Sequence, residues 1–382
     1  MNFAFTEEQE ELREMARGFL AETSSSEQVR AAMTSDLGFD PEVWKRIGAE
    51  LGWTAITIPD AYGGLGLSAV ELTALMEVMG GALLCSPFLA TVCLAADAIL
   101  AIGSEDQKQA LLPAIAEGQS RATLALSGPS GRWDASGIET IAAPEADGFR
   151  INGSQRFVLD GHSAELLLVG ARREGTQGEE GVSLFAVPGD TAGLSREPLP
   201  TMDQTRRLAV VELQDVRVPA SALLGEEGQA WPALAGTLDR AAVALAAEQV
   251  GGAQRCLDAS VEYALERVQF GRTIASFQAI KHKCADMMVA VESARSAAYY
   301  AACVAAEDGE ALPMAASLAK ATCSEAFFRC AADSLQIHGG VGFTWEYDVH
   351  LFFKRARSME GFLGDPAWHR ERVASRLMED PR

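Results

Sequence analysis

The sequence lacks the features that would place it in a membrane or around a metal ion. No apolar run reaches about 18 residues free of charge, so we predict no transmembrane helix. The start of the chain shows no basic stretch followed by an apolar one, so we expect no signal peptide and a cytoplasmic protein. The five histidines are scattered without the spacing of metal ligands, so we expect no metal site.

Cysteine is scarce, and basic charge is in deficit. The seven cysteines are odd in number and form no CxxC pair, which predicts buried, reduced thiols. The 53 acidic residues outnumber the 32 basic ones, giving a net charge of −21. Because nucleic acids and anionic membranes attract basic surfaces, this balance argues against nonspecific binding to either. A few placed arginines still suffice to hold an anionic small molecule.

The motifs of several common chemistries are also missing. The sequence contains no GxSxG and no P-loop, so nucleophilic and phosphoryl-transfer chemistry have no motif support. The glycine-rich run that follows His338 does not come after a strand pattern, as a GxGxxG dinucleotide motif would. A histidine in such a turn is most often structural.

Three segments with different periodicities are present instead: 1–121, 122–225 and 226–382. In the first, Thr6 and Gln9 have the spacing of a capping box, and helical periodicity follows. Further helical patterns in this segment cover Val43–Leu51, Ala69–Gly80, Phe88–Ala101 and Glu105–Glu117, with a glycine-rich loop at Ile58–Ser68.

The second and third segments complete the predicted fold. Short runs of valine, leucine, isoleucine and phenylalanine predict a compact antiparallel β domain, in which Asn152-Gly153 indicates a two-residue hairpin. Long Ala-rich helices then predict a bundle. These helices are expected near Trp231–Arg267, Ser276–Asp308, Leu312–Ile337 and Val349–Ser358. The fold class is therefore α+β and mostly α, in the order α, β, α bundle.

Two stretches of the third segment suggest a ligand site. Arg267 precedes Phe270-Gly271 at a predicted helix end, and Phe277-Gln278 follow a break. An arginine suits a phosphate, an aromatic ring suits a flat ligand, and an amide suits ring edges. Taken alone, an arginine and a glycine at a helix end are more often structural. The second stretch is the Gly339-Gly340 turn, where a ligand could approach the backbone closely.

Together these stretches resemble the acyl-CoA dehydrogenase family. TEEQEELREMARGFLAE, IPDAYGGLGLS, INGSQRFVLDG, RVQFGRTIASFQAIKHKCADM and QIHGGVGFTWEYDVHLFFKRA occur in the order and spacing of that family over essentially the whole chain. The resemblance implies an N-terminal α domain, a middle β domain and a C-terminal four-helix bundle. It also implies noncovalent FAD, an acyl-CoA thioester substrate, an electron-transfer flavoprotein as electron acceptor, and assembly into dimers or tetramers.

The same resemblance carries residue roles to this chain. Residues that match the FAD contacts of the family are Arg267, Gln269, Phe270, Phe277, Gln278, Gln336, Gly339, Gly340 and Ser127. Several of them serve an FAD shared between two subunits. Where the family has a Gly-Ser pair and a threonine near the flavin, this chain has Arg132-Trp133 and Leu159. We therefore expect a crowded channel, unless that loop moves aside.

The catalytic base is the sharpest departure. The family position of the catalytic glutamate falls at Leu363, before Gly364, and the alternative position used by some members falls near Ala241, beside Asp239 and Arg240. Neither position holds a carboxylate; Asp239 next to Arg240 is more often an ion pair. Glu248, two turns along the same helix, is a weak candidate for a displaced base, and more often such a residue is an ordinary polar one. Asp365 and Glu360 are weaker candidates still.

Four interpretations remain open at this point. Some family enzymes consist of two related subunits, one of which keeps the fold without the base and often ends in a segment similar to FLGDPAWHRER; this chain resembles that second subunit. The alternatives are a homomeric dehydrogenase with a displaced base, a CoA-thioester-binding scaffold without flavin, and an acyl-CoA desulfinase that needs no base.

Overall fold

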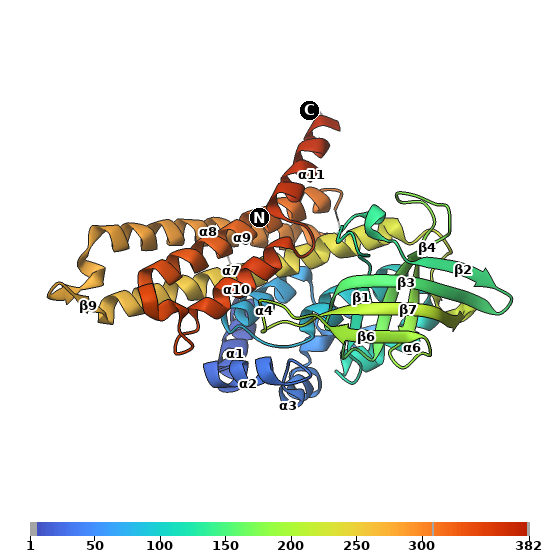
Figure 1. Cartoon of the computed structure of the whole chain (residues 1–382), viewed down its shortest axis with the longest axis horizontal. Helices are drawn as coiled ribbons and strands as arrows, with labels where there is room; N and C mark the ends of the chain where they lie inside the picture. Colours follow the sequence, from blue (N-terminus) through green and yellow to red (C-terminus); the bar gives the residue numbers. More distant parts are fainter. Residues whose placement is uncertain (1–5, 308, 380–382) are drawn as a thin grey trace. The chain divides into compact units, whose positions relative to one another are not determined.

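A computed structural model describes residues 6–307 and 309–379 of the chain. By contacts, the chain forms two compact units. Unit 1 contains the chain up to Ala31, Ala69–Leu84 and the chain from Ala242 onward; unit 2 contains Ala32–Ser68 and Cys85–Ala241. Figure 1 shows the helices and strands of the chain, coloured by their place in the sequence. The long helix α7 (Trp231–Glu266) contributes residues to both.

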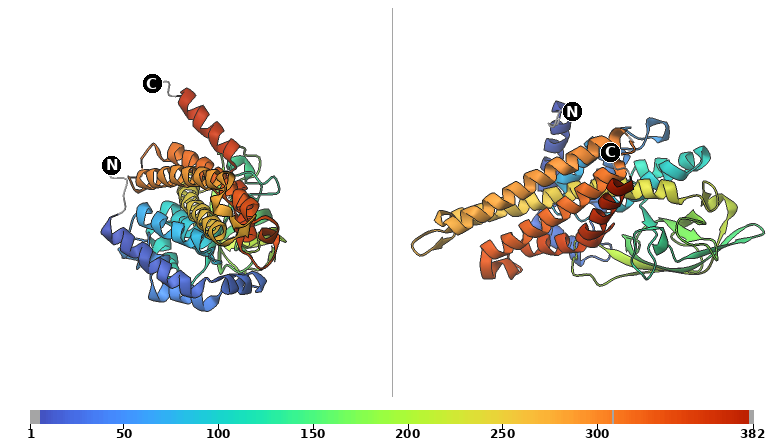
Figure 2. Two further views of the ribbon diagram at one scale, coloured as in Figure 1. Left: turned by 90° about the vertical axis from the view of Figure 1, so that its left-hand side faces the viewer. Right: turned by 90° about the horizontal axis from the view of Figure 1, so that it is seen from above.

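Unit 1 is helical. Helix α9 packs against α8, α10 and α11, and α1 packs against α4. In both Figure 1 and Figure 2, α7 and α8 run alongside each other as long yellow and orange helices. The bounds of these helices are α1 (Glu7–Thr23), α4 (Ala69–Gly81), α8 (Gln278–Glu307), α9 (Leu312–His338), α10 (Val349–Gly361) and α11 (Pro366–Glu379).

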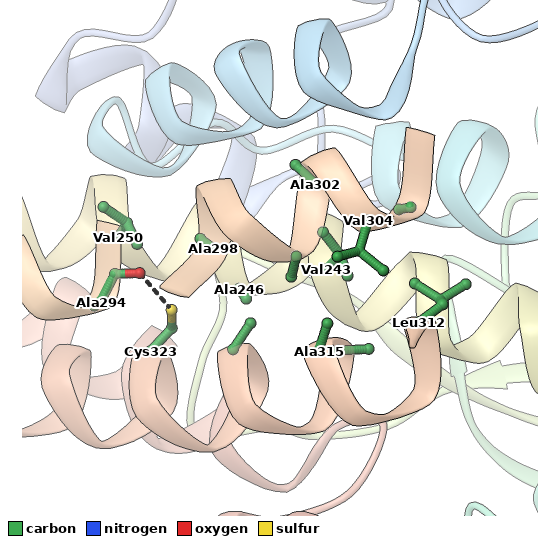
Figure 3. Close-up of a cluster of buried hydrophobic side chains, with 14 of the residues drawn as sticks. Val243, Ala246, Val250, Ala294, Ala298, Ala302, Val304, Leu312, Ala315 and Cys323 are labelled. Atoms are coloured by element: carbon green, nitrogen blue, oxygen red, sulfur yellow. Dashed lines mark hydrogen bonds between the residues drawn. The ribbon is translucent and has the colours of Figure 1, made fainter. Parts of the chain in front are cut away.

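Small side chains fill the core of this bundle. Figure 3 shows alanines and valines of α7, α8 and α9 meeting between the helices, with Leu312 at one end. The Cys323 thiol donates to the carbonyl of Ala294 at 3.3 Å across the α8–α9 contact. Because alanine lets helix backbones approach closely, the Ala-rich sequence becomes a tightly packed helical unit.

Unit 2 is built around a sheet of eight described strands in the order β6-β7-β3-β2-β4-β5-β8, with β1 beside β4. Most pairings are antiparallel, as predicted, but β1 and β2 each pair with β4 in parallel. The strands are β1 (Ala122–Ala125), β2 (Ile141–Glu145), β3 (Gly148–Leu159), β4 (Leu166–Arg172), β5 (Val182–Pro188), β6 (Leu194–Pro198), β7 (Leu208–Pro219) and β8 (Leu223–Leu224).

Helices of the first segment pack within unit 2 as well. They include α3 (Pro41–Lys45), the π-helix η4 (Leu89–Ala96), α5 (Asp97–Ile102) and α6 (Glu105–Ala116). Gln107 of α6 donates to the carbonyls of Ser221 and Leu223 beside the sheet. Thr91 of η4 donates to the carbonyl of Ala122 at the start of β1. These bonds tie the helices to the strands that follow them in the chain.

The predicted hairpin at Asn152-Gly153 is wrong. Both residues lie inside β3, at an irregularity of its pairing with β7. The Asn152 side chain accepts a hydrogen bond from the Asp215 amide at 2.8 Å, and a Cβ on Gly153 would lie 2.6 Å from Thr140 Oγ1. Asparagine and glycine therefore serve here for a bulge and for a close approach of the backbone. The turn that joins β2 to β3 lies earlier in the chain, at residues 146–147.

The other predicted elements agree with the structure except at their ends. The Thr6–Gln9 capping box is present at the start of α1. The pattern over Val43–Leu51 becomes α3 followed by a short π-helix, η1 (Arg46–Glu50), and a helix that we did not predict, α2 (Ser26–Thr34), follows α1. Asp308, the predicted end of the helix that starts near Ser276, lies outside the described residues.

Three further expectations concern cysteines, metals and membranes. All seven cysteines are free, five of them buried and two partly buried. In residues 6–307 and 309–379, no three His, Cys, Asp or Glu side chains are grouped so as to hold a metal ion. Over the same ranges, no helix combines the length and the apolar character that a membrane crossing needs.

Candidate active site

A tight hairpin follows the C-terminal end of α7. Two short strands, β9 (Val268–Gln269) and β10 (Arg272–Thr273), pair antiparallel. Phe270 and Gly271 form the turn with φ of 52° and 77°, and a two-residue type I′ turn requires positive φ at both positions. The helix therefore ends at this motif as predicted, but a hairpin rather than a simple helix cap follows. It leaves the Phe270 side chain 92% exposed.

The C-terminal end of α9 lies beside the end of α7. Tyr263 of α7 stacks on His338 of α9 with ring centroids 4.3 Å apart, and Tyr347 meets the edges of both rings. His338 Nδ1 lies 2.8 Å from the Ser334 carbonyl, to which its N–H donates. Burial lowers the pKa of His338, which favours the neutral ring. The geometry is that of a structural histidine, as the sequence suggested.

The Gly339-Gly340 turn opens the short helix η8 (Gly339–Phe343) and faces open space. Gly339 has a φ of 63°, and a Cβ at either glycine would meet no heavy atom within 4 Å. The Gln336 side chain, one turn earlier, is exposed. A ligand can therefore approach this backbone closely, which is the property that glycines provide.

The ends of α7 and α9 thus collect eight of the nine residues predicted to contact FAD at one end of unit 1. They are Arg267, Gln269, Phe270, Phe277, Gln278, Gln336, Gly339 and Gly340. Phe277 lies edge-on to Phe270 at 6.1 Å, and the Arg272 guanidinium lies 4.2 Å from the Phe277 ring centroid. An exposed aromatic ring, side-chain amides and a guanidinium are the groups that a flat ring system and a pyrophosphate require, so the residues present fit the ADP part of FAD.

The ninth residue, Ser127, lies in unit 2 on the segment that follows β1. It is 2% exposed, and its carbonyl accepts a hydrogen bond from the Arg156 amide at 2.8 Å. Phe157, which follows Arg156 in the chain, adopts a φ of 58° at an irregularity of β3. Its ring lies 3.3 Å from where a Cβ on Gly131 would be. Phe157 is 41% exposed, so an aromatic edge is available on this wall.

Arg132 and Leu159, two residues at which this chain departs from the family pattern near the flavin, have defined partners in unit 2. Arg132 forms an ion pair with Asp134 at 2.6 Å, which holds its guanidinium against its own loop. Leu159 is 1% exposed and belongs to the interior, and its carbonyl accepts a hydrogen bond from Thr123 Oγ1. The leucine therefore replaces a hydroxyl by buried apolar surface.

Residue 363, the family position of the base, lies in a strained corner between α10 and α11, which we define as Gly361–Asp365. Leu363 is 3% exposed and has a φ of 60°, a conformation that costs a non-glycine residue about 1–2 kcal/mol. Gly364 follows with a φ of 100°, and a Cβ there would lie 2.3 Å from the Trp368 ring. His369 Nε2 donates to the Leu363 carbonyl at 3.0 Å. The corner therefore presents an apolar side chain at residue 363.

The carboxylates around the corner have other partners. Glu360 forms an ion pair with Arg357. Asp365 accepts a hydrogen bond from the Trp368 amide at 2.8 Å and so caps the first turn of α11. Glu371 is exposed on α11. The contacts of Glu360 and Asp365 are therefore structural ones.

Glu248 is engaged in the interior of unit 1. Its carboxylate accepts a hydrogen bond from Arg355 of α10 at 2.6 Å, and the two side chains are 5% and 2% exposed. A carboxylate held by a buried guanidinium is poorly placed to take a proton from a substrate carbon. At the other candidate position, Ala241 is fully buried and Arg240 pairs with Asp97 at 2.7 Å. The sequence suggested an ion pair of Arg240 with Asp239, and the structure adds Asp97 as a partner of Arg240 from a different helix.

Two residues that sequence reasoning missed stand beside the corner. Lys320 of α9 is fully buried, and burial lowers its pKa to about 7. His369 is also buried, and burial, with the nearby charges of Lys320 and Arg372, lowers its pKa to about 3. In the sequence, Lys320 appears only as a charged residue within an Ala-rich helix. Periodicity predicts that such a lysine lies on the surface, and so it gives no sign that this one is buried.

Comparison with known proteins gives three matches along the chain. Residues 6–119, 123–216 and 228–378 match the N-terminal, middle and C-terminal domains of acyl-CoA dehydrogenase, respectively. The chain is 35% identical over 364 residues to the acyl-CoA dehydrogenase IpdE2 of Mycolicibacterium smegmatis, covering 94% of this chain and 96% of that protein.

Solved structures agree in fold. Butyryl-CoA dehydrogenase from Megasphaera elsdenii superposes with a TM-score of 0.90 at 29% identity, covering 99% of this chain and 100% of the other. The ChsE4-ChsE5 complex from Mycobacterium tuberculosis gives a TM-score of 0.89 at 27% identity, with full coverage of both chains. With its fold, its FAD-type motifs and its relatives in agreement, the chain belongs to the acyl-CoA dehydrogenase family of FAD-dependent oxidoreductases.

Proposed function

We propose that this chain is the base-deficient subunit of a heteromeric acyl-CoA dehydrogenase. The observation that carries the proposal is Leu363: the corner keeps its left-handed backbone and its glycine but presents an apolar side chain where the family has a carboxylate. Removal of a proton next to a thioester carbonyl requires a base within hydrogen-bond reach of that proton. A leucine cannot act as one.

The eight residues at the end of unit 1 supply FAD contacts in this proposal. Arg267 would hold the pyrophosphate, while Phe270 and Phe277 would contact the flat adenosine and Gln278 its polar edges. Gln336 and the Gly339-Gly340 turn would accept the ADP part of an FAD whose ring sits in a partner subunit. Ser127 is assigned to an FAD contact of unit 2. When bound, FAD supplies a hydride acceptor.

The partner subunit supplies the base and completes the flavin-ring pocket in this proposal. Support comes from a structural relative at 27% identity that is itself described as a complex of two components. A homo- or heterotetramer, an acyl-CoA thioester substrate and an electron-transfer flavoprotein as electron acceptor follow from the family resemblance. A screen of acyl-CoA thioesters that differ in their acyl group would determine which of them the enzyme accepts.

The second candidate function is a homomeric dehydrogenase with a displaced base. The ion pair between Glu248 and Arg355 counts against its first candidate, and the capping role of Asp365 and the Arg357 partner of Glu360 count against the weaker ones. A flavin-free scaffold is disfavoured by the open FAD-type surface on unit 1. A desulfinase, which needs no base, is distinguished by testing a sulfinyl-CoA substrate for sulfite release.

The test measures FAD content and anaerobic flavin bleaching. We expect about half an FAD per chain when the chain is co-produced with a base-bearing relative, and little FAD when it is produced alone. One FAD per chain from the isolated protein, bleached by acyl-CoAs, would contradict the subunit assignment.

Leu363→Glu tests the base position directly. The substituted chain is co-produced with a relative whose own base is replaced by glutamine, and the complex is loaded with FAD. We expect this complex to gain acyl-CoA-dependent bleaching, because the corner backbone already has the required conformation. Leu363→Gln is the matched control, with the same length and no base, and it should show no gain. Equal bleaching by both variants would overturn the assignment of residue 363.

A further inference from the structure

We propose that Lys320 is the positioning residue of the corner, holding the backbone of residue 363 in the conformation that presents its side chain at the base position. This inference rests on the proposed assignment of residue 363. Lys320 itself is fully buried and is argued to act only through the corner backbone.

The Lys320 ammonium group lies among four acceptors. Nζ donates to the carbonyls of Glu360, Met359 and Gly364 at 3.0, 3.1 and 3.2 Å, and it lies 2.9 Å from Ser324 Oγ. A primary ammonium has three N–H donors, so these acceptors account for all of them. The contacts span α9, the last turn of α10 and the far side of the corner.

The three carbonyls explain why a cation stands here. The last four carbonyls of a helix have no partner within the helix, and Met359 and Glu360 belong to the last turn of α10. A positive charge at a helix C-terminus is also favoured by the helix dipole. Nζ bonds to carbonyls on both sides of residue 363, so it holds the two ends of the corner together. We call these three hydrogen bonds the clamp.

Neighbouring bonds keep the clamp in register. Ser324 Oγ donates to Gln249 Oε1 at 3.1 Å, and Gln249 Nε2 lies 3.4 Å from the Met359 carbonyl, which links α7 to the same turn. His369 Nε2 donates to another corner carbonyl, that of Leu363. Burying a charged group costs free energy, and a loop without a fixed conformation would not require such a group to bind its carbonyls. The chain therefore maintains the geometry of the base position although residue 363 is a leucine.

The test combines Lys320→Met, which keeps the length and removes the donors, with Leu363→Glu. In the FAD-loaded protein we expect Lys320→Met to lower the kcat of the Leu363→Glu variant by about tenfold or more, because a misplacement of about 1 Å can cost that much. KM and FAD content should change less than twofold, since the corner positions the base and not the cofactor. A merely structural role would reduce the amount of folded enzyme and leave kcat per FAD unchanged.

Hydrogen exchange gives a readout that is independent of activity. In the otherwise native chain, Lys320→Met should speed exchange of the amides of residues 361–369 by about tenfold or more, while α8 and the sheet of unit 2 keep the native rates. Lys108→Met, at a surface ion pair on α6, is the matched control and should change neither exchange nor bleaching. Unchanged exchange and unchanged kcat would overturn the inference.

The outcomes separate this inference from the proposed function. If Leu363→Glu gains no bleaching, the base assignment is wrong, and with it the catalytic meaning of the clamp, whatever the exchange shows. If Leu363→Glu gains bleaching and Lys320→Met leaves it intact, only the inference fails. Should Lys320→Met not fold, Lys320→Gln, which keeps an amide donor, replaces it and should show a smaller fall in kcat of the same kind.

Discussion

At the scale of single residues, the interior of unit 1 holds more charge than its Ala-rich sequence suggests. Glu248 and Arg355 pair between α7 and α10, and Lys320 bonds the end of α10 from α9. Each side chain is almost fully buried, so each must be compensated where it lies. Their common effect is to fasten α10 and the corner after it.

Glu248→Gln should destabilise the protein, since it removes the charge of a carboxylate that the buried Arg355 guanidinium contacts. We expect the free energy of unfolding to fall by about 3–5 kcal/mol, measured by urea denaturation. Replacing both partners in Glu248→Leu/Arg355→Met should restore part of that loss. Flavin bleaching per folded, FAD-loaded protein should not change; loss of bleaching without loss of stability would restore Glu248 as a displaced base.

Gly364→Ala should distort the corner. A Cβ there would lie 2.3 Å from the Trp368 ring, and its φ of 100° strains any side chain. We expect a loss of about 1–3 kcal/mol in the free energy of unfolding. Gly361→Ala is the matched control, because its Cβ would meet no heavy atom within 4 Å, and it should stay within about 0.5 kcal/mol of the native chain. Equal stability of the two variants would show that the corner is not packed as described.

At the scale of elements, the ends of helices carry the candidate FAD contacts. The bodies of α7 and α9 are packed in the core, whereas the β9–β10 hairpin and the η8 turn present exposed side chains and open backbone. The stacking of Tyr263 on His338 joins these two ends. The candidate cofactor surface is therefore built from turns at the ends of packed helices.

Phe270→Asn tests this surface without breaking the hairpin. Asparagine tolerates the left-handed conformation at this position, so the turn should persist while the aromatic contact is lost. We expect the Kd for FAD to rise about tenfold or more, measured by fluorescence titration, since stacking on an aromatic side chain contributes about 1–3 kcal/mol. Leu377→Asn, an exposed apolar residue of α11, should bind FAD like the native chain. An unchanged Kd for Phe270→Asn would remove Phe270 from the cofactor site.

At the scale of the whole molecule, the net charge is strongly acidic, yet four of the five histidines have a pKa that the fold lowers. Burial lowers the pKa of His162, His338, His350 and His369. The folded chain therefore keeps these imidazoles neutral at pH values where an unfolded chain protonates them.

Stability should fall as the pH drops below about 6.5, the ordinary pKa of histidine. His369 titrates near 6.5 in the unfolded chain but at about 3 in the folded one, so the unfolded chain binds more protons between these values. This one group should lower the free energy of unfolding by up to about 1.4 kcal/mol per pH unit in that window. Urea denaturation at pH 7 and pH 5 measures the slope.

The variant His369→Gln isolates this contribution from that of other groups. It should show a shallower pH dependence than the native chain, whereas His282→Gln, at an exposed position, should keep the native slope. Identical slopes for all three proteins would contradict a neutral, buried His369.

The fold was largely predictable from the sequence, for physical reasons. Periodicity reports which face of an element is buried, so α1, α4 and the long helices appeared with their ends correct to a few residues. The Asn152-Gly153 hairpin failed because the same residue pair also serves a bulge inside a long strand. Turn chemistry specifies a backbone conformation and not the element that uses it.

The sequence by itself determined the order of helices and strands, the FAD-type motifs and the leucine at position 363. Only the tertiary structure decided which charges meet. Arg240 pairs with Asp97, 143 positions away, Glu248 with Arg355, 107 positions away, and Lys320 with a carbonyl 39 positions on. Such pairings depend on where packing brings distant side chains. For that reason the leucine at position 363 is visible in the sequence, whereas the contacts of Lys320 with the corner carbonyls became visible only in the fold.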